Sequence, residues 1–260
     1  MIVKWFSSIQ KKISIFTLLF FLKKSLSISN NVRHLNFCME SICYVKKKRN
    51  GDLAFSEEKQ TNWKHKWTKQ TVTYALQRDS VDIKGRSIEE RAVNLAFTTW
   101  NIEIPLKLRS TRGKNPDIKI NFCHSKDDKI FSKEKNVLAY AYYPKTKHQG
   151  TINFNEDYLW TVNGKPILAW KVDSRYDRNN RTKLRSYSLV HVMIHELGHC
   201  LGLTHDATDK KSVMWWQYNG QMNLSSYDVN RITEKYGKRQ WRGRIYSRVK
   251  NWLKRRKDRL

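Results

Sequence analysis

The chain has 260 residues, with 51 Lys and Arg against 23 Asp and Glu, so its formal net charge is +28 at pH 7. This length leaves room for one domain with terminal tails. The charge favours an acidic partner, such as an anionic membrane or a glycan. Specific nucleic-acid binding is not expected, because no nucleic-acid-binding motif accompanies the charge.

The N-terminal region, residues 1–56, begins like a targeting segment. Two lysines precede an apolar run at residues 13–22, which suits a signal peptide and is too short to span a bilayer as a helix. Lys23 and Lys24 follow the run directly, and no small-residue cleavage site is evident, so an uncleaved anchor is the alternative. We therefore expect a secreted protein or one tethered through this hydrophobic segment.

Strands and one amphipathic helix are predicted next along the chain. Apolar and polar residues alternate in two stretches, at Val72, Tyr74 and Leu76 and at Ile118, Ile120 and Phe122. This two-residue period indicates strands. Ser87 and Glu90 are spaced as a capping box ahead of apolar residues that recur every four positions up to Trp100, which predicts a helix. Strands followed by helices predict an α+β domain with helices packed on one sheet.

The stretch from His195 to His205 is the most informative part of the chain, because it reads H-E-x-x-H-x-x-G-x-x-H. Residues four apart share one face of a helix, so His195 and His199 can point at one metal ion. Gly202 can adopt the positive φ that ends a helix, so the chain can turn back and deliver His205 as a third ligand. Three imidazoles with one open position are typical of a catalytic zinc. Glu196 lies beside that metal, where it can act as the general base.

A methionine, Met214, follows His205 by nine residues, and here the sequence resembles the metzincin metalloproteases. Their Met-turn places a methionine under the three histidines, so the resemblance implies this structural role for Met214. Within that clan the chain is most similar to the matrixins, the matrix metalloproteinase type. The stretches that carry this likeness are 67–76, 92–100, 116–122, 137–144, 150–155 and 224–237. The resemblance implies a catalytic domain at 57–237, with a twisted, mostly parallel sheet, an active-site helix and a C-terminal helix, and no haemopexin domain.

The chain departs from the matrixin pattern where that family binds its other ions. Matrixins hold a structural zinc through one Asp and three His, but here Tyr140 and Asn153 stand at two of the His positions. Only His124, with Asp127 or Asp128, matches the set. Tyr and Asn are poor zinc ligands, so we expect no structural zinc. Calcium carboxylates are replaced by Ser132, Asn155 and Tyr158, which leaves calcium dependence open.

The resemblance also implies a substrate cleft. In matrixins the peptide adds to the sheet edge, along the strand that here contains Leu138, Ala139 and Tyr140. His191, four residues before the first zinc ligand, corresponds to the floor of the S1′ pocket, and Tyr218 corresponds to its wall. A packed core histidine is the alternative for His191. The short loop at 219–223 suggests a modest apolar P1′ residue.

Two basic segments fall outside the likeness, an insertion at about 162–186 and a tail at 238–260. The insertion enters just before the zinc helix, and a solvated loop is favoured over an exosite. The tail has eleven basic residues and one acidic residue, with apolar residues at helical spacing. This pattern predicts a basic amphipathic helix that can bind an anionic membrane or glycan, and a solvated charged tail is the alternative.

Two functions compete on these observations. The first is a monomeric zinc endopeptidase of extracellular or matrix-type proteins, with Glu196 as general base. The second is a catalytically vestigial metzincin that acts as a basic binding protein. Because Glu196, Gly202, Met214 and all three histidine ligands are present, the sequence favours the enzyme.

Overall fold

The computed structural model describes residues 45–47, 53–55, 64–134, 137–168, 183–241 and 245–259. All of them belong to one compact unit, Leu35–Leu260. The predicted signal-like run at 13–22 lies outside the described residues, and so do residues 169–182 of the predicted insertion. No helix in the described parts of the chain is long and apolar enough to cross a membrane.

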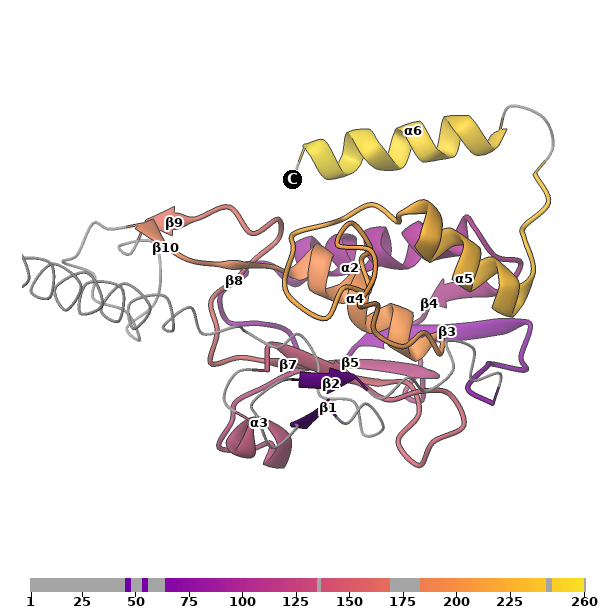
Figure 1. The fold of residues 1–260 in the computed structure, drawn as a ribbon. Helices are drawn as coiled ribbons and strands as arrows, with labels where there is room; N and C mark the ends of the chain where they lie inside the picture. The colour runs from indigo at the N-terminus through magenta and orange to yellow at the C-terminus, as the bar shows by residue number, and fades with distance from the viewer. Residues whose placement is uncertain are drawn as a thin grey trace, which may run out of the picture. The chain divides into compact units, whose positions relative to one another are not determined.

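A five-stranded sheet forms the centre of this unit, with strand order β4-β3-β5-β7-β6 (Figure 1). Its strands are β3 (Thr71–Leu76), β4 (Lys107–Ser110), β5 (Ile118–Cys123), β6 (Ala139–Ala141) and β7 (Thr151–Asn155). The first four strands in this spatial order pair in parallel, and β6 runs antiparallel to β7 at the edge. The predicted α+β fold with a mostly parallel sheet is therefore confirmed.

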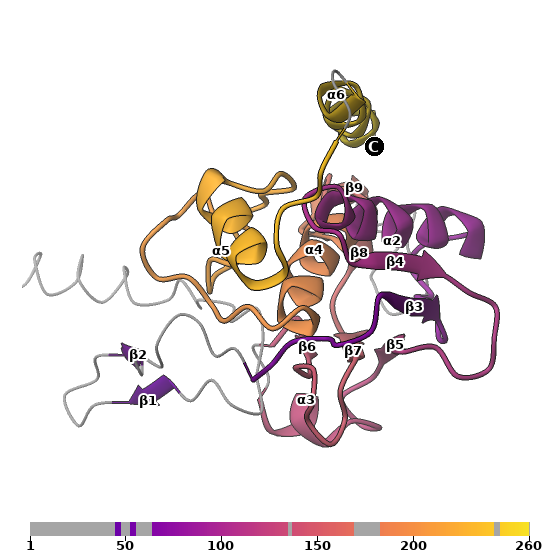
Figure 2. The same cartoon turned by 90° about the vertical axis from the view of Figure 1, so that its right-hand side faces the viewer.

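The helices cover the sheet unequally (Figure 2). They are α2 (Arg86–Asn101), α3 (Lys129–Lys133), α4 (Leu189–Cys200), α5 (Ser226–Tyr236) and α6 (Ile245–Asp258). Helices α2 and α4 pack against each other on one side of the sheet, and the short α3 lies on the other side. The core between α2, α4 and the sheet includes Phe97, Trp100, Ile120 and Phe154, all at most 1% exposed.

The predicted capping box of Ser87 and Glu90 is wrong. Helix α2 begins at Arg86, so Ser87 already lies within its first turn, and the N-cap is Gly85, with a φ of 111° and no side-chain cap. Glu90 instead accepts a hydrogen bond from Arg86 Nε at 3.1 Å, the pairing of residues four apart on one helix face.

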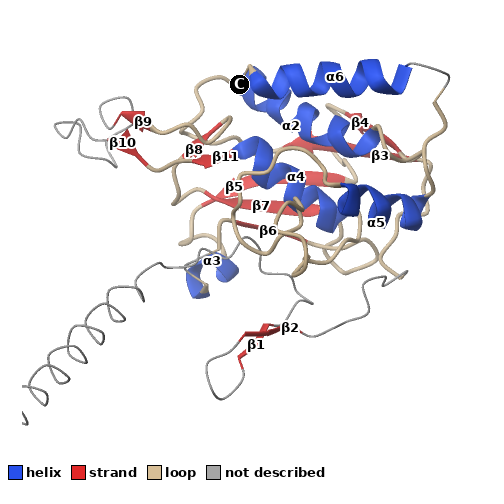
Figure 3. Ribbon diagram, turned by 45° about the horizontal axis from the view of Figure 1, so that its top comes forward, coloured by secondary structure: helices blue, strands red, loops and turns tan. Residues whose placement is uncertain are grey.

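Short strand pairs complete the fold (Figure 3). These are β1 (Val45–Lys47) with β2 (Leu53–Phe55), β8 (Trp160–Thr161) with β11 (Tyr187–Ser188), and β9 (Ile167–Leu168) with β10 (Lys183–Leu184). The parallel β8–β11 pair leads directly into α4, and the β9–β10 pair flanks the undescribed part of the predicted insertion.

Candidate metal centre and substrate cleft

Helix α4 carries the first two predicted zinc ligands and is buried along its whole length. Its N-cap is Ser188, whose Oγ accepts a hydrogen bond from the backbone N–H of His191 at 3.2 Å. On its other side, Trp100 of α2 donates from Nε1 to the carbonyl of Ile194 at 2.9 Å. The helix is therefore anchored both at its start and one residue before His195.

The structure brings His195, His199 and His205 together, with one ligand atom from each within 4.8 Å of the others. Within the described residues, this is the one group of three or more His, Cys, Asp or Glu that converge in this way. His195 and His199 are fully buried, and His205 is partly exposed. Burial, with the neighbouring His199 and His205, lowers the pKa of His195 well below its usual value, which favours the neutral imidazole that binds metals.

The backbone sets the tautomer of two of these imidazoles. His195 Nδ1 donates to the carbonyl of Val213, and His199 Nδ1 donates to the carbonyl of Leu203, both at 2.7 Å. A carbonyl can only accept, so Nδ1 carries the hydrogen and Nε2 presents a lone pair. The two Nε2 atoms lie 3.1 Å apart, where two acceptors repel unless a cation lies between them. Zinc–nitrogen bonds of about 2.0–2.1 Å in tetrahedral geometry give nitrogen pairs at close to this separation, so the residues fit the zinc that the motif implies.

Gly202 forms the turn that returns the chain after α4. Its φ is +87°, and its amide donates to the carbonyl of His199 at 2.7 Å. A Cβ at this position would lie 1.8 Å from the carbonyl oxygen of His65, so a side chain would displace the segment that leads into β3. Glycine is therefore required by both the backbone conformation and the close approach.

Met214 packs against α4 at Gly198, the one residue of that helix without a side chain. A Cβ on Gly198 would lie 2.2 Å from Met214 Sδ, so the glycine makes room for the methionine between the first two histidines. Met214 is fully buried, as a packing role beneath the histidines requires.

Asp228 of α5 holds this turn, and the sequence analysis missed it. Its carboxylate accepts hydrogen bonds from the Val213 amide at 3.0 Å and from the Ser212 hydroxyl. The Ser212 hydroxyl in turn accepts from the Met214 amide at 2.9 Å. The available signal was the capping box that Ser225 forms with Asp228, but nothing in that local pattern pointed to the turn.

Glu196, the predicted general base, follows His195 on α4, and its side chain is fully buried. One turn later along α4, burial of the Cys200 thiol raises its pKa well above the usual value, and the negative charge of Glu196 adds to the rise. Cys200 Sγ lies 3.7 Å from the carbonyl of Tyr142. A buried thiol with a raised pKa is a weak nucleophile, so Cys200 is a structural residue here.

The predicted substrate strand lies at the edge of the sheet. Leu138, Ala139 and Tyr140 are buried, and β6 pairs with β7 alone among the strands that the structure describes. The Tyr140 hydroxyl donates to Asp128 at 2.7 Å, at the N-cap of α3. Tyr140 can therefore offer a substrate only its backbone, because its side chain is engaged elsewhere.

The two predicted S1′ residues meet at the start of α4. The His191 and Tyr218 rings contact edge to face, with centroids 4.8 Å apart. His191 Nδ1 donates to the carbonyl of Gln221, and the Tyr218 hydroxyl accepts from the Ser188 amide at 3.1 Å. Burial lowers the pKa of His191 to about 4, so this imidazole is neutral at pH 7.

A second polar cluster contains Tyr140 and Asn153, which stand at two of the positions predicted from the resemblance for structural-zinc ligands. Asn153 Nδ2 donates to the Tyr140 hydroxyl at 2.6 Å and to Asp128 Oδ2 at 3.3 Å, and Asn121 Nδ2 donates to Asn153 Oδ1 at 3.1 Å. We call these four residues the Asp128 cluster. His124 is not part of it, because its Nδ1 pairs with Asp157 Oδ1 at 2.9 Å. The donor set of the Asp128 cluster does not fit zinc.

Asn155, at one of the predicted calcium positions, uses both ends of its amide in hydrogen bonds. Its Nδ2 donates to the carbonyl of Val137 at 3.2 Å, and its Oδ1 accepts from the Asp157 amide at 3.0 Å. These bonds connect Asn155 to the segment before β6 and to the turn after β7.

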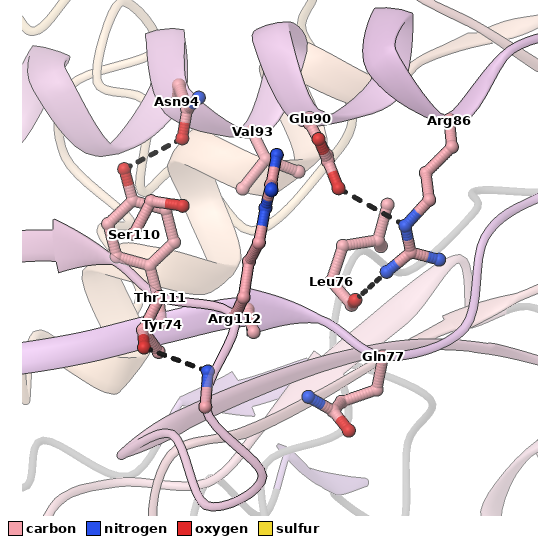
Figure 4. A pocket seen from close by; sticks show the side chains of 12 residues that line it. Tyr74, Leu76, Gln77, Arg86, Glu90, Val93, Asn94, Ser110, Thr111 and Arg112 are labelled. Atoms are coloured by element: carbon pink, nitrogen blue, oxygen red, sulfur yellow. Dashed lines mark hydrogen bonds and ion pairs between the residues drawn. The ribbon is translucent and has the colours of Figure 1, made fainter.

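A groove of about 470 Å³ lies between α2 and the ends of β3 and β4 (Figure 4). Figure 4 shows Arg86 spanning it, bonded to Glu90 and to the carbonyl of Leu76, with Arg112 extended beside α2. None of the predicted site residues lines this groove, so we assign it no part in the chemistry of the histidines.

Comparison with known proteins identifies the family of this chain. The matrixin family profile matches residues 66–237. The chain is 32% identical to human (Homo sapiens) matrilysin over 180 residues, which are 67% of this chain and 60% of the relative. It is 28% identical to interstitial collagenase of Equus caballus over 205 residues, 77% of this chain and 39% of the relative, so it spans well under two thirds of that protein. Identity to macrophage metalloelastase of Oryctolagus cuniculus is 29% over 177 residues, 66% of this chain and 33% of the relative. With the profile covering more than half of its length, the chain belongs to the matrixin family.

Proposed function

We propose that this protein is a zinc-dependent endopeptidase in which His195, His199 and His205 hold one zinc ion. The observation that carries the proposal is the convergence of three imidazole nitrogens within 4.8 Å, with two of the rings oriented by backbone carbonyls. Membership of a zinc protease family supports the same metal.

The chemistry divides between the metal and the chain. A zinc ion in this site supplies Lewis-acid polarisation of a peptide carbonyl and acidifies a water molecule. Glu196 takes the proton from the attacking water and passes it to the nitrogen of the leaving amine, without a covalent intermediate. Val213 and Leu203 keep the imidazoles in the ligating tautomer throughout, because their carbonyls accept from Nδ1.

The substrate is proposed to bind as an added strand along β6, with its P1′ side chain toward His191 and Tyr218. The free edge of β6 among the described strands supports this mode, since backbone hydrogen bonds supply the affinity. An interstitial collagenase among the relatives supports extracellular or matrix-type proteins as substrates, and with them a secreted enzyme.

A catalytically vestigial binding protein is the second candidate. Exposed basic residues on α6 beside Trp252, which is 44% exposed, support a proposed contact with an anionic membrane or glycan. That contact is compatible with protease activity, so the two candidates separate only on catalysis.

The test compares the full chain with its Glu196→Ala variant. Zinc content, cleavage of a quenched peptide and cleavage of gelatin are measured on both proteins. We expect about one zinc per chain in each and cleavage by the wild type alone. Bound zinc without cleavage by the wild type would reject the endopeptidase and leave the binding protein. Equal cleavage by both proteins would reject Glu196 as the base.

A further inference from the structure

The inner face of α6 is a narrow apolar stripe that includes one cation. Tyr246, Val249, Leu253 and Lys257 recur at three- or four-residue spacing, so they share one side of the helix. Leu253 is 3% exposed and Lys257 is 4% exposed, whereas most of the other residues of α6 are exposed. A lysine this deeply buried needs acceptors for its ammonium group.

The first half of α6 is fixed to the end of α2. The Tyr246 hydroxyl lies 2.9 Å from both carboxylate oxygens of Glu103, which is 2% exposed, and Lys250 Nζ donates to the same hydroxyl at 3.1 Å. Just before α6, Trp241 Nε1 donates to the carbonyl of Ile102 at 2.9 Å. These contacts set where the helix starts and in which direction it runs.

The second half of α6 reaches the loop that borders the proposed S1′ pocket. Lys257 Nζ donates to the carbonyl of Met222, and it lies 3.3 Å from Asn223 Oδ1. The preceding residue, Gln221, accepts with its carbonyl from His191 Nδ1. Two consecutive carbonyls of one loop therefore accept hydrogen bonds from different helices, one from His191 of α4 and one from the buried ammonium of Lys257 on α6.

Other bonds of this loop reach the start of α4 or the preceding segment, or stay within the loop. Asn219 Nδ2 donates to the carbonyl of Lys210 at 3.0 Å and to that of Ser212 at 2.9 Å. Met222 Sδ lies 3.9 Å from the Ser188 hydroxyl, and the Gln221 amide donates to Asn219 Oδ1 at 3.0 Å. Residues 218–223 belong to no helix or strand, and such a segment opens more readily than the elements around it. A buried charged donor to one of its carbonyls therefore helps to hold its conformation.

We infer that α6 is a specificity element of the protease, in which Lys257 holds the loop at 217–223 closed over the S1′ pocket. This rests on the proposed function, because it assigns a role to the rim of the same cleft. With the ammonium in place, the loop limits the pocket to small and medium apolar P1′ side chains. Without it, the Met222 carbonyl loses its charged donor and the pocket admits large aromatic P1′ residues. Lys257 is a positioning residue, since it acts through the loop.

The test uses the full chain with Lys257→Met, which keeps the apolar stem and removes the ammonium. Lys254→Met is the matched control, because it removes the same charge from an exposed position on the same helix. Two peptides that differ only in Leu or Trp at P1′ are compared by kcat/KM. We expect Lys257→Met to raise the Trp-to-Leu ratio by about three- to tenfold. Lys254→Met should stay within about twofold of wild type.

Hydrogen exchange of residues 217–223 provides a readout that does not need catalysis. We expect faster exchange there in Lys257→Met than in Lys254→Met, and partial recovery in Lys257→Arg, which restores a donor. If a melting curve shows that Lys257→Met does not fold, Leu253→Ala replaces it in both assays, because it weakens the packing of the same face of α6. Unchanged exchange and an unchanged P1′ ratio would overturn the inference. Faster exchange in a chain whose wild type cleaves nothing would instead reject the protease function and keep the contact between α6 and the loop.

Discussion

The three converging histidines, His195, His199 and His205, and the Asp128 cluster are two groups of polar side chains with different chemistry. Both gather polar side chains from separate segments, on α4 and its following loop in one case and around β6, β7 and α3 in the other (Figure 2). In the first, two imidazole Nε2 atoms face each other at 3.1 Å, an arrangement that a bound cation would stabilise. In the second, the Tyr140 hydroxyl donates to Asp128 at 2.7 Å, so the polar side chains satisfy one another by hydrogen bonds. One matrixin domain thus contains a group of histidines that could hold a metal ion and a second polar cluster whose side chains bond to one another.

Metal removal is the most drastic way to test this contrast. We expect zinc to bind with a stoichiometry of one per chain, and His199→Ala to lose both the metal and all peptidase activity, because two imidazoles cannot replace three. Chelation of the wild type should abolish cleavage, and added zinc should restore it. Elemental analysis and a peptide assay check both results.

Asn153→Ala is the matched control for the metal count. It alters the Asp128 cluster and leaves the histidines untouched, so zinc should stay at one per chain. Two zinc ions per wild-type chain and one per Asn153→Ala chain would show that the Asp128 cluster binds zinc. The two groups of side chains would then not differ in their chemistry.

Glu89 is a third polar group of the core, a buried carboxyl whose Oε2 has no hydrogen-bond donor among the described residues. It is fully buried on α2, and its Oε1 accepts from the Ser80 amide at 2.8 Å. Burial is the main cause that raises its pKa from 4.5 to about 7, with Asp79 and Glu156 adding to the rise and Ser80 and Arg86 opposing it. Because the folded pKa is the higher one, the stability it contributes is fully present below pH 4.5 and is lost as the pH rises through 7.

Glu89→Gln should therefore stabilise the protein at high pH only. The gain in the free energy of unfolding over wild type should be near zero at pH 4.5 and reach about 3 kcal/mol at pH 8, since the amide never ionises. Urea unfolding of both proteins across this range measures the difference, in which the other titrating groups cancel. A gain that is constant with pH would mean that the Glu89 carboxyl does not titrate between these values.

Sequence patterns predicted the elements whose signals are local. The spacing of His195, His199, Gly202 and His205 encodes its own geometry, because helical periodicity and one positive φ suffice to bring the ligands together. Alternation of apolar residues predicted the strands for the same reason. The predicted basic helix of the tail likewise follows from spacing along a single segment, and the structure forms α6 there.

Contacts between distant segments could not be predicted in this way. Asp228 holds the Met214 turn across 15 residues of sequence, and Lys257 reaches Met222 across 35. Neither position is unusual in its local pattern, since one reads as a helix cap and the other as part of a charged tail. The predicted capping box at Ser87 is wrong because the N-cap is Gly85, two residues before the cap that the side chains suggested, and it needs no side-chain hydrogen bond.

The smallest effect is expected from loss of one hydroxyl in the Asp128 cluster. Tyr140→Phe removes the donor to Asp128 Oδ2 and the acceptor for Asn153 Nδ2, and leaves both partners in a partly buried site. Such a loss should lower the free energy of unfolding by about 0.5–1.5 kcal/mol. Zinc content and kcat/KM should stay close to wild type, because only the backbone of Tyr140 borders the proposed cleft.

Tyr142→Phe, on the same edge of the sheet, is the control for loss of a phenol. Equal unfolding energies in the two variants would mean that the cluster contributes nothing to stability, whereas a loss of zinc in Tyr140→Phe alone would connect the two sites that this comparison separates.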